Sequence, residues 1–146
     1  GTANAGDDLL LEMGDGLGTP NITDVRFITS APAGGSSKTV TCEVTWDEGV
    51  TVAGSPQLTV ANNNAGSGSG RTCVLTYTAT GSSANRKRFT ATNITVAEDD
   101  VLSVGAATGS LALNSGTLSD TEMGGTAVPA FVSLTDTSAV TQTVTG

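Results

Sequence analysis

The sequence predicts an all-β domain, and three observations support this prediction. Apolar residues alternate with Thr and Glu from Thr39 to Trp46, and alternation recurs from Arg71 to Thr80, as in strands with one buried face. Turn-forming residues recur about every eight to twelve positions, which is typical of a sandwich. Aromatic residues make up only 3% of the 146 residues, so the core is expected to consist mainly of Val, Leu, Ile and Ala. We therefore expect a β-sandwich.

The N-terminal half is expected to begin with a strand at Ile22–Thr29. Ala31–Ser37 contains Pro and Gly and is expected to be a loop. The second strand, Thr39–Trp46, has the clearest alternation in the chain, and the acidic stretch Asp47–Gly49 is expected to turn the chain after it. Together these segments predict two strands that share one buried face.

The remainder of the chain is expected to form short strands separated by turns and by a polar loop over residues 61–70. Apolar residues recur at no 3.6-residue period for long, so we expect no helix longer than a turn or two. The expected strands are Val50–Val52, Gln57–Val60, Arg71–Thr80, Arg88–Val96, Val101–Val104, Ser110–Leu113 and Ala130–Leu134, with Val140–Val144 as a last strand or part of a C-terminal arm.

The length fits one domain with extended ends. We place the sandwich at residues 20–134, an N-terminal arm at residues 1–19, and a C-terminal arm or last strand at residues 135–146. Both ends hold little to bury, so contacts must offset the entropy of ordering them. A neighbouring subunit that binds Leu9, Leu10 and Leu11 is the expected source of these contacts. Alternatively, the ends add edge strands to their own domain.

Charge and composition argue against several classes of function. Fourteen acidic and six basic residues give a formal net charge of −8, which disfavours binding to nucleic acid. No apolar run reaches about 18 residues, so no membrane-spanning helix is expected. The first residues lack the basic region and the long apolar stretch of a signal peptide. Gly1 fits synthesis in the cytoplasm followed by removal of an initiator Met, and it fits a processed chain equally well. Histidine is absent, which removes the commonest general base and metal ligand, so we expect no enzyme and no cofactor.

The only basic cluster, Arg86, Lys87 and Arg88, is expected in a loop where its charges contact solvent. The alternative is that this cluster docks on an acidic neighbour in an assembly.

Two sets of residues are candidates for a site. Calcium takes about six to eight oxygen ligands from loops that converge in space, and Asp47, Glu48, Asp99 and Asp100 supply carboxylates if their turns lie at the same end of the sandwich. The sequence has no acidic loop of the EF-hand type, which favours solvated turns instead.

Cys42 and Cys73 each occupy an inward position of an expected strand. Two facing sheets would bring them together in a disulfide; the alternative is two buried free thiols.

Three segments together resemble a family of bacterial and phage immunoglobulin-like domains, found as repeats in large secreted adhesins and singly in virion proteins. They read VTCEVTWDEGVTVAGSPQLTV, RTCVLTYTAT and VAEDDVLSVGAATGSLALNSGTLSDTEMGGTA, and the resemblance covers residues 22–134. It departs from the family at Cys42 and Cys73, where apolar residues or Thr are usual. The resemblance implies an immunoglobulin-like β-sandwich.

The resemblance implies a structural protein of a tailed-phage virion. The expected role is a decoration or cement protein on the outer surface of the head, bound through its arms to the major capsid protein or other virion subunits and forming a homo-oligomer. The alternative is an adhesion or binding module of a bacterial surface protein or of a phage tail or fibre. A glycan hydrolase is disfavoured, because the chain has few aromatic residues to form a platform for a sugar.

Overall fold

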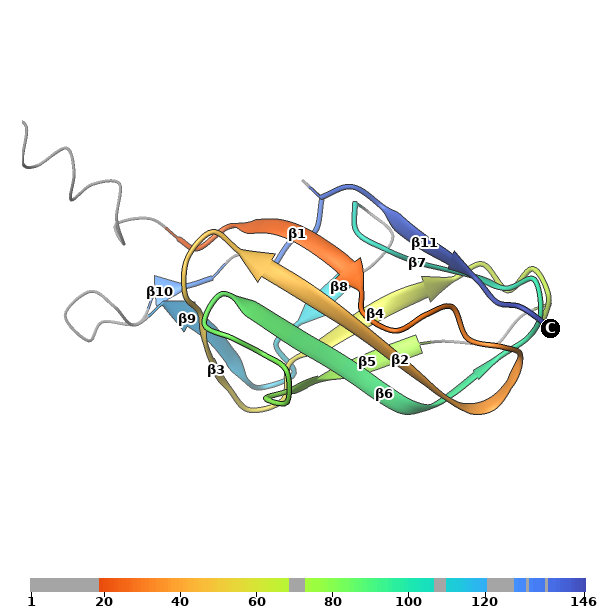
Figure 1. The fold of residues 1–146 in the computed structure, drawn as a ribbon. Coiled ribbons are helices and arrows are strands. Elements are labelled where there is room, and N and C mark those ends of the chain that lie inside the picture. Colours follow the sequence, from red (N-terminus) through yellow and green to blue (C-terminus); the bar gives the residue numbers. More distant parts are fainter. Residues whose placement is uncertain (1–18, 69–72, 107–109, 121–127, 131, 136) are drawn as a thin grey trace, which may run out of the picture.

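The computed structural model describes residues 19–68, 73–106, 110–120, 128–130, 132–135 and 137–146, and it confirms the all-β class. Among these residues there is no helix. The strands, shown in Figure 1, are β1 (Ile22–Phe27), β2 (Gly35–Trp46), β3 (Thr51–Ala53), β4 (Gln57–Asn62), β5 (Cys73–Thr78), β6 (Arg86–Val96), β7 (Val101–Val104), β8 (Ser110–Ala112), β9 (Thr117–Asp120), β10 (Val128–Pro129) and β11 (Val140–Thr143).

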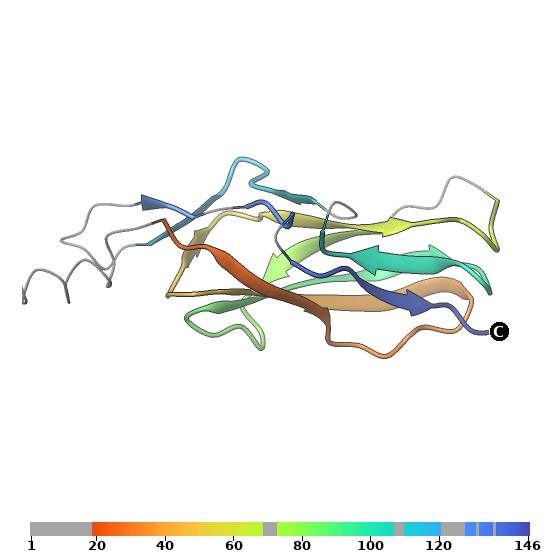
Figure 2. The same ribbon diagram turned by 90° about the horizontal axis from the view of Figure 1, so that it is seen from above.

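The main sheet has the neighbour order β1-β2-β6-β5-β4-β7-β11, with β8 also paired to β4. Its two edges come together, because β1 lies beside β11 (Figures 1 and 2). Past the end of β1, the Gln142 side-chain amide donates to the Thr29 carbonyl at 2.7 Å, and Ala33 and Thr145 form a parallel bridge. The sheet is thus nearly closed into a barrel-like sandwich, which protects its edges from pairing with other chains.

The neighbour order also bears on the family resemblance. In an immunoglobulin constant-type sandwich the strands lie in the orders A-B-E-D and C-F-G. When the seven strands of the main sheet order are lettered A to G along the chain, the orders A-B-E-D and C-F-G correspond to β1-β2-β6-β5 and β4-β7-β11. Here, however, β4 pairs with β5 and joins the two groups into one sheet. The immunoglobulin-like assignment therefore stays a prediction that the strand order favours.

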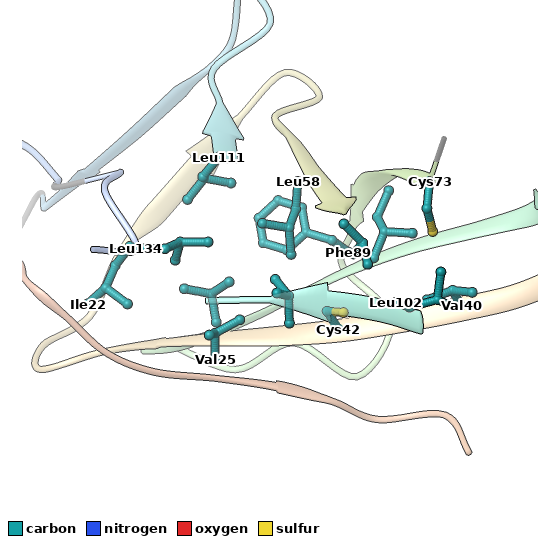
Figure 3. Close-up of a cluster of buried hydrophobic side chains, with 14 of the residues drawn as sticks. Ile22, Val25, Val40, Cys42, Leu58, Cys73, Phe89, Leu102, Leu111 and Leu134 are labelled. Atoms are coloured by element: carbon teal, nitrogen blue, oxygen red, sulfur yellow. The ribbon is translucent and has the colours of Figure 1, made fainter. Parts of the chain in front are cut away.

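The core follows the period-two pattern of the strands. On β2, the inward residues Val40, Cys42, Val44 and Trp46 are fully buried. Phe89 on β6 lies in the same core, and its ring meets that of Tyr77 edge-on at a centroid distance of 6.2 Å. Figure 3 shows Phe89 among Val, Leu, Ile and Cys side chains, as the low aromatic content predicts.

Three expectations about individual strands are wrong. β2 begins at Gly35, inside the expected loop, because β6 is long enough to pair with it as far as Val96. The pairing is irregular there, and Ser37 has a φ of 59°, which indicates a bulge. No described residue between 130 and 134 lies in a strand. In addition, β9 and β10 form a small sheet with β3, and neither β9 nor β10 is among the expected strands.

The structure describes most of the C-terminal segment but not residues 1–18. Four residues of the C-terminal segment form β11, which pairs with β7 from Val140↔Val104 to Thr143↔Val101. Val144 is buried in the core. This part of residues 135–146 is therefore a strand of the domain. Leu9, Leu10 and Leu11 lie outside the described residues.

Candidate functional site

The four carboxylates considered for calcium do not converge. Asp47 and Glu48 follow β2, whereas Asp99 and Asp100 follow β6, and these two strands are antiparallel. Thr45 pairs with Arg86 and Gly35 pairs with Val96, so the two acidic turns lie at opposite ends of β6. Ten residues at about 3.3 Å each place them roughly 30 Å apart. The idea of one calcium site from all four residues is therefore wrong.

Among the described residues, no group of three or more Cys, Asp or Glu side chains is placed to hold a metal ion. Asp47 instead accepts a hydrogen bond from the backbone N–H of Asn21 at 2.9 Å. This contact ties the turn after β2 to the chain just before β1.

Asp100 is the centre of a buried polar network. One carboxylate oxygen accepts the backbone N–H groups of Gly66 and Ser67, each at 2.9 Å. The other accepts the side-chain amide of Asn62 at 3.2 Å and the N–H of Ala97 at 3.0 Å, and the Ser67 hydroxyl reaches both oxygens. The carboxylate therefore ties the loop after β4 to the turn between β6 and β7.

The network also controls the charge of Asp100. Burial by itself would raise the pKa of this carboxyl, but the hydrogen bonds from Ala97, Asn62 and Ser67 outweigh burial and hold the pKa well below its usual range. The group is therefore ionised at neutral pH and saturated with donors. Its role is to close a loop, and no local pattern in the sequence indicates this, because the donors Asn62, Gly66 and Ser67 lie more than thirty positions away.

A second buried carboxylate, Glu43, lies between two arginines on the outer face of the sheet. Arg26 of β1 donates Nε and Nη2 to Oε1 at 3.2 and 3.0 Å, and Arg88 of β6 donates Nε to Oε2 at 3.2 Å. Burial would raise the pKa of Glu43, but the hydrogen bonds and charges of Arg26 and Arg88 lower it. Pairing of β1, β2 and β6 places the three side chains in one row.

The basic cluster at residues 86–88 lies in β6 and not in a loop. Successive side chains of a strand point to opposite faces of the sheet, so the three residues do not share one face. Arg86 and Arg88 point outward, whereas Lys87 is buried. We call the outer surface that carries Arg26, Arg86 and Arg88 the arginine face. Lys87 donates its amine to the Ser83 carbonyl at 2.6 Å, and burial lowers its pKa. This lysine therefore stabilises the turn before β6.

The inward side of Lys87 borders a cavity of about 370 Å³. Asp120, which is also buried, contributes to the wall from β9. The other lining residues come from the turn before β3, from β3 itself and from the turn before β6; they are Gly49, Val50, Thr51, Val52 and Ala84. The cavity is large enough for a small polar molecule.

A smaller and mostly apolar hollow of about 210 Å³ lies over β9 and the end of β10. Leu113, with 41% of its surface exposed, and Leu118 and Pro129 line it. Val74 on β5 is the other described large hydrophobic residue with notable exposure, at 40%. Single exposed hydrophobic residues of this kind are normal on protein surfaces.

The two cysteines are buried free thiols, so the disulfide considered from the sequence is not formed. Both lie in the core (Figure 3), but β6 runs between β2 and β5, the strands that carry them. Phe89 pairs with both Cys42 and Tyr77, and Cys73 lies four residues from Tyr77 along β5. The two Cα atoms are therefore separated by two strand spacings, about 9–10 Å, and by a further offset along the strands, whereas a disulfide requires less than about 7 Å. The expectation that facing sheets bring them together is wrong, because they lie two strands apart in one curved sheet.

We predict that both thiols resist modification in the folded protein. Burial raises the pKa of Cys73 to about 11 and that of Cys42 further, which leaves almost no thiolate at neutral pH. A thiol-specific reagent such as DTNB should react with neither cysteine in buffer and with both in denaturant. A reducing agent should leave the melting temperature unchanged, and a drop on reduction would contradict the free-thiol state.

Comparison of the chain with models of protein families, with curated proteins and with solved structures gave no match. In the part of the chain that the structure describes, no helix is long and apolar enough to span a bilayer.

Proposed function

We propose that this protein is a structural component of a tailed-phage virion that decorates or cements the outer surface of the head. One observation supports a structural role above the others. The buried carboxylates Asp100 and Glu43 are saturated by donors from the protein itself, so each joins distant segments. Buried carboxylates often serve in catalysis, but these two stabilise the domain.

The fold is suited to display on a particle. Its main sheet is nearly closed, so few strand edges are free to pair with other chains. An acidic surface keeps particles soluble and mutually repelling. The N-terminal segment, with Leu9, Leu10 and Leu11, binds neighbouring coat subunits in this proposal. Many copies on a symmetric shell convert a modest contact into strong retention.

Quantitative mass spectrometry of the purified virus tests this proposal. A shell component is present in hundreds of copies per particle, whereas a tail or fibre component is present in a handful. Absence from washed particles would contradict a virion role altogether. The adhesin alternative makes a different prediction: a repeat stiffened by calcium would melt at a higher temperature when calcium is added.

A further inference from the structure

The negative charge of this chain is concentrated at its N-terminus. Residues 1–18 contain Asp7, Asp8, Glu12 and Asp15 and neither Lys nor Arg, so this eighth of the chain contributes half of the formal net charge of −8. The arginine face carries the opposite charge. It gathers three of the six basic residues of the chain on β1 and β6, which flank β2, and these outnumber the two carboxylates of the same face, Glu43 and Asp24.

The arginine face keeps donors available for a ligand. Arg26 uses Nε and Nη2 to bind Glu43, but a guanidinium carries five N–H groups, and 53% of this side chain is exposed. Arg88 uses Nε for Glu43 and is 32% exposed. Arg86 is exposed and forms no ion pair with the other described residues. Carboxylates of an extended segment are suitable partners for these groups.

The acidic segment enters the fold close to this face. β1 begins at Ile22, which pairs with Trp46, and Arg86 pairs with the adjacent Thr45. Two strand spacings therefore separate Ile22 from Arg86, about 10 Å. Asp15 precedes Thr19 by four residues, which span up to about 14 Å when extended. Glu12 reaches further, and glycines at positions 14, 16 and 18 let the chain reverse direction.

We propose that residues 1–18 bind the arginine face of their own chain. Tethering next to the face gives the acidic segment a high local concentration there, so weak ion pairs suffice. The contact does not depend on the virion role. If that role holds, the contact keeps Leu9, Leu10 and Leu11 close to their own domain until a coat subunit competes for the segment.

Nuclear magnetic resonance of the full chain tests the contact. The variant D7N/D8N/E12Q/D15N removes the charges of the segment and keeps its length. At low ionic strength (about 0.02 M), the side-chain N–H signals of Arg26, Arg86 and Arg88 should differ between this variant and the unmodified chain. At about 0.5 M salt the two spectra should converge, because exposed charges are then screened. Identical spectra at low salt would overturn the proposal.

A pair of charge reversals locates the contact. Arg86→Glu should shift the backbone signals of residues 7–15 toward their high-salt positions. Lys38→Glu makes the same change in net charge, but Lys38 pairs with Ile94, roughly 26 Å along β6 from Arg86, and should leave these signals unchanged. Equal effects of both reversals would contradict a specific contact.

A dilution series distinguishes binding of residues 1–18 to their own chain from binding to a second copy of the protein. Signals that report a contact within one chain do not change with protein concentration, whereas occupation by a second copy weakens on dilution and would overturn the proposal as stated. Because this experiment uses the free protein, its failure leaves the virion role standing. Failure to find the protein on particles would likewise leave the contact standing.

Discussion

Replacing Asp100 by Ala is expected to lower the free energy of unfolding by about 3 kcal/mol or more at neutral pH. The substitution leaves the N–H groups of Gly66, Ser67 and Ala97 without their acceptor. Asp100→Asn should cost a similar amount, because its NH₂ group would face donors. Urea unfolding at pH 7 measures both changes.

Asp99→Asn is the matched control for Asp100→Asn. Asp99 is exposed and has a φ of 74°, a conformation that Asn also tolerates. The same chemical change one position away should therefore alter the free energy of unfolding by about 0.5 kcal/mol or less. A loss at position 99 equal to that at position 100 would show that the turn, and not the buried carboxylate, is sensitive.

The stabilising effect of Asp100 should depend on pH with a defined sign. Its pKa is lowered in the folded state, so below the ordinary value of about 3.9 the unfolded chain binds the proton more readily than the folded one. The contribution is therefore complete above that value and is lost as the pH falls toward the lower, folded pKa. The stability difference between the unmodified chain and Asp100→Asn should shrink between about pH 5 and pH 2.

The second large effect is expected at Phe89, which is fully buried between Cys42 and Tyr77 on the neighbouring strands. Phe89→Ala removes a ring from a core with few other aromatic residues and should cost about 3–5 kcal/mol, a large part of the stability of a domain of this size. Thermal and urea unfolding would show the loss.

Two further substitutions control for the change at Phe89. Phe89→Leu keeps most of the volume and should cost less than Phe89→Ala. Val74→Ala, on the outer face of the neighbouring strand β5, should change stability by about 0.5 kcal/mol or less. If Phe89→Ala were as mild as Val74→Ala, the core would not be packed as described.

Some residues of the candidate site were visible in the sequence and others were not. Burial of Cys42 and Cys73 follows from the alternation of apolar and polar residues, because every second side chain of a strand points to the same face of the sheet. The sequence did not reveal that Lys87 points inward while Arg86 and Arg88 point outward. The apolar pattern indicates a strand that begins at Arg88, whereas β6 begins two residues earlier. Pairing with β2 extends β6 to Arg86 and turns Lys87 inward.

The sequence by itself determined the all-β class, the aliphatic core and the inward face of the main strands, because these depend on neighbours one or two positions apart. Only the tertiary structure decided which strands are adjacent and which turns share an end. It placed β6 between the two cysteines, and it separated the acidic turns while surrounding Asp100 with donors from a distant loop. Strand pairing is set by hydrogen bonds between remote segments, and alternation along a single strand carries no record of its partners.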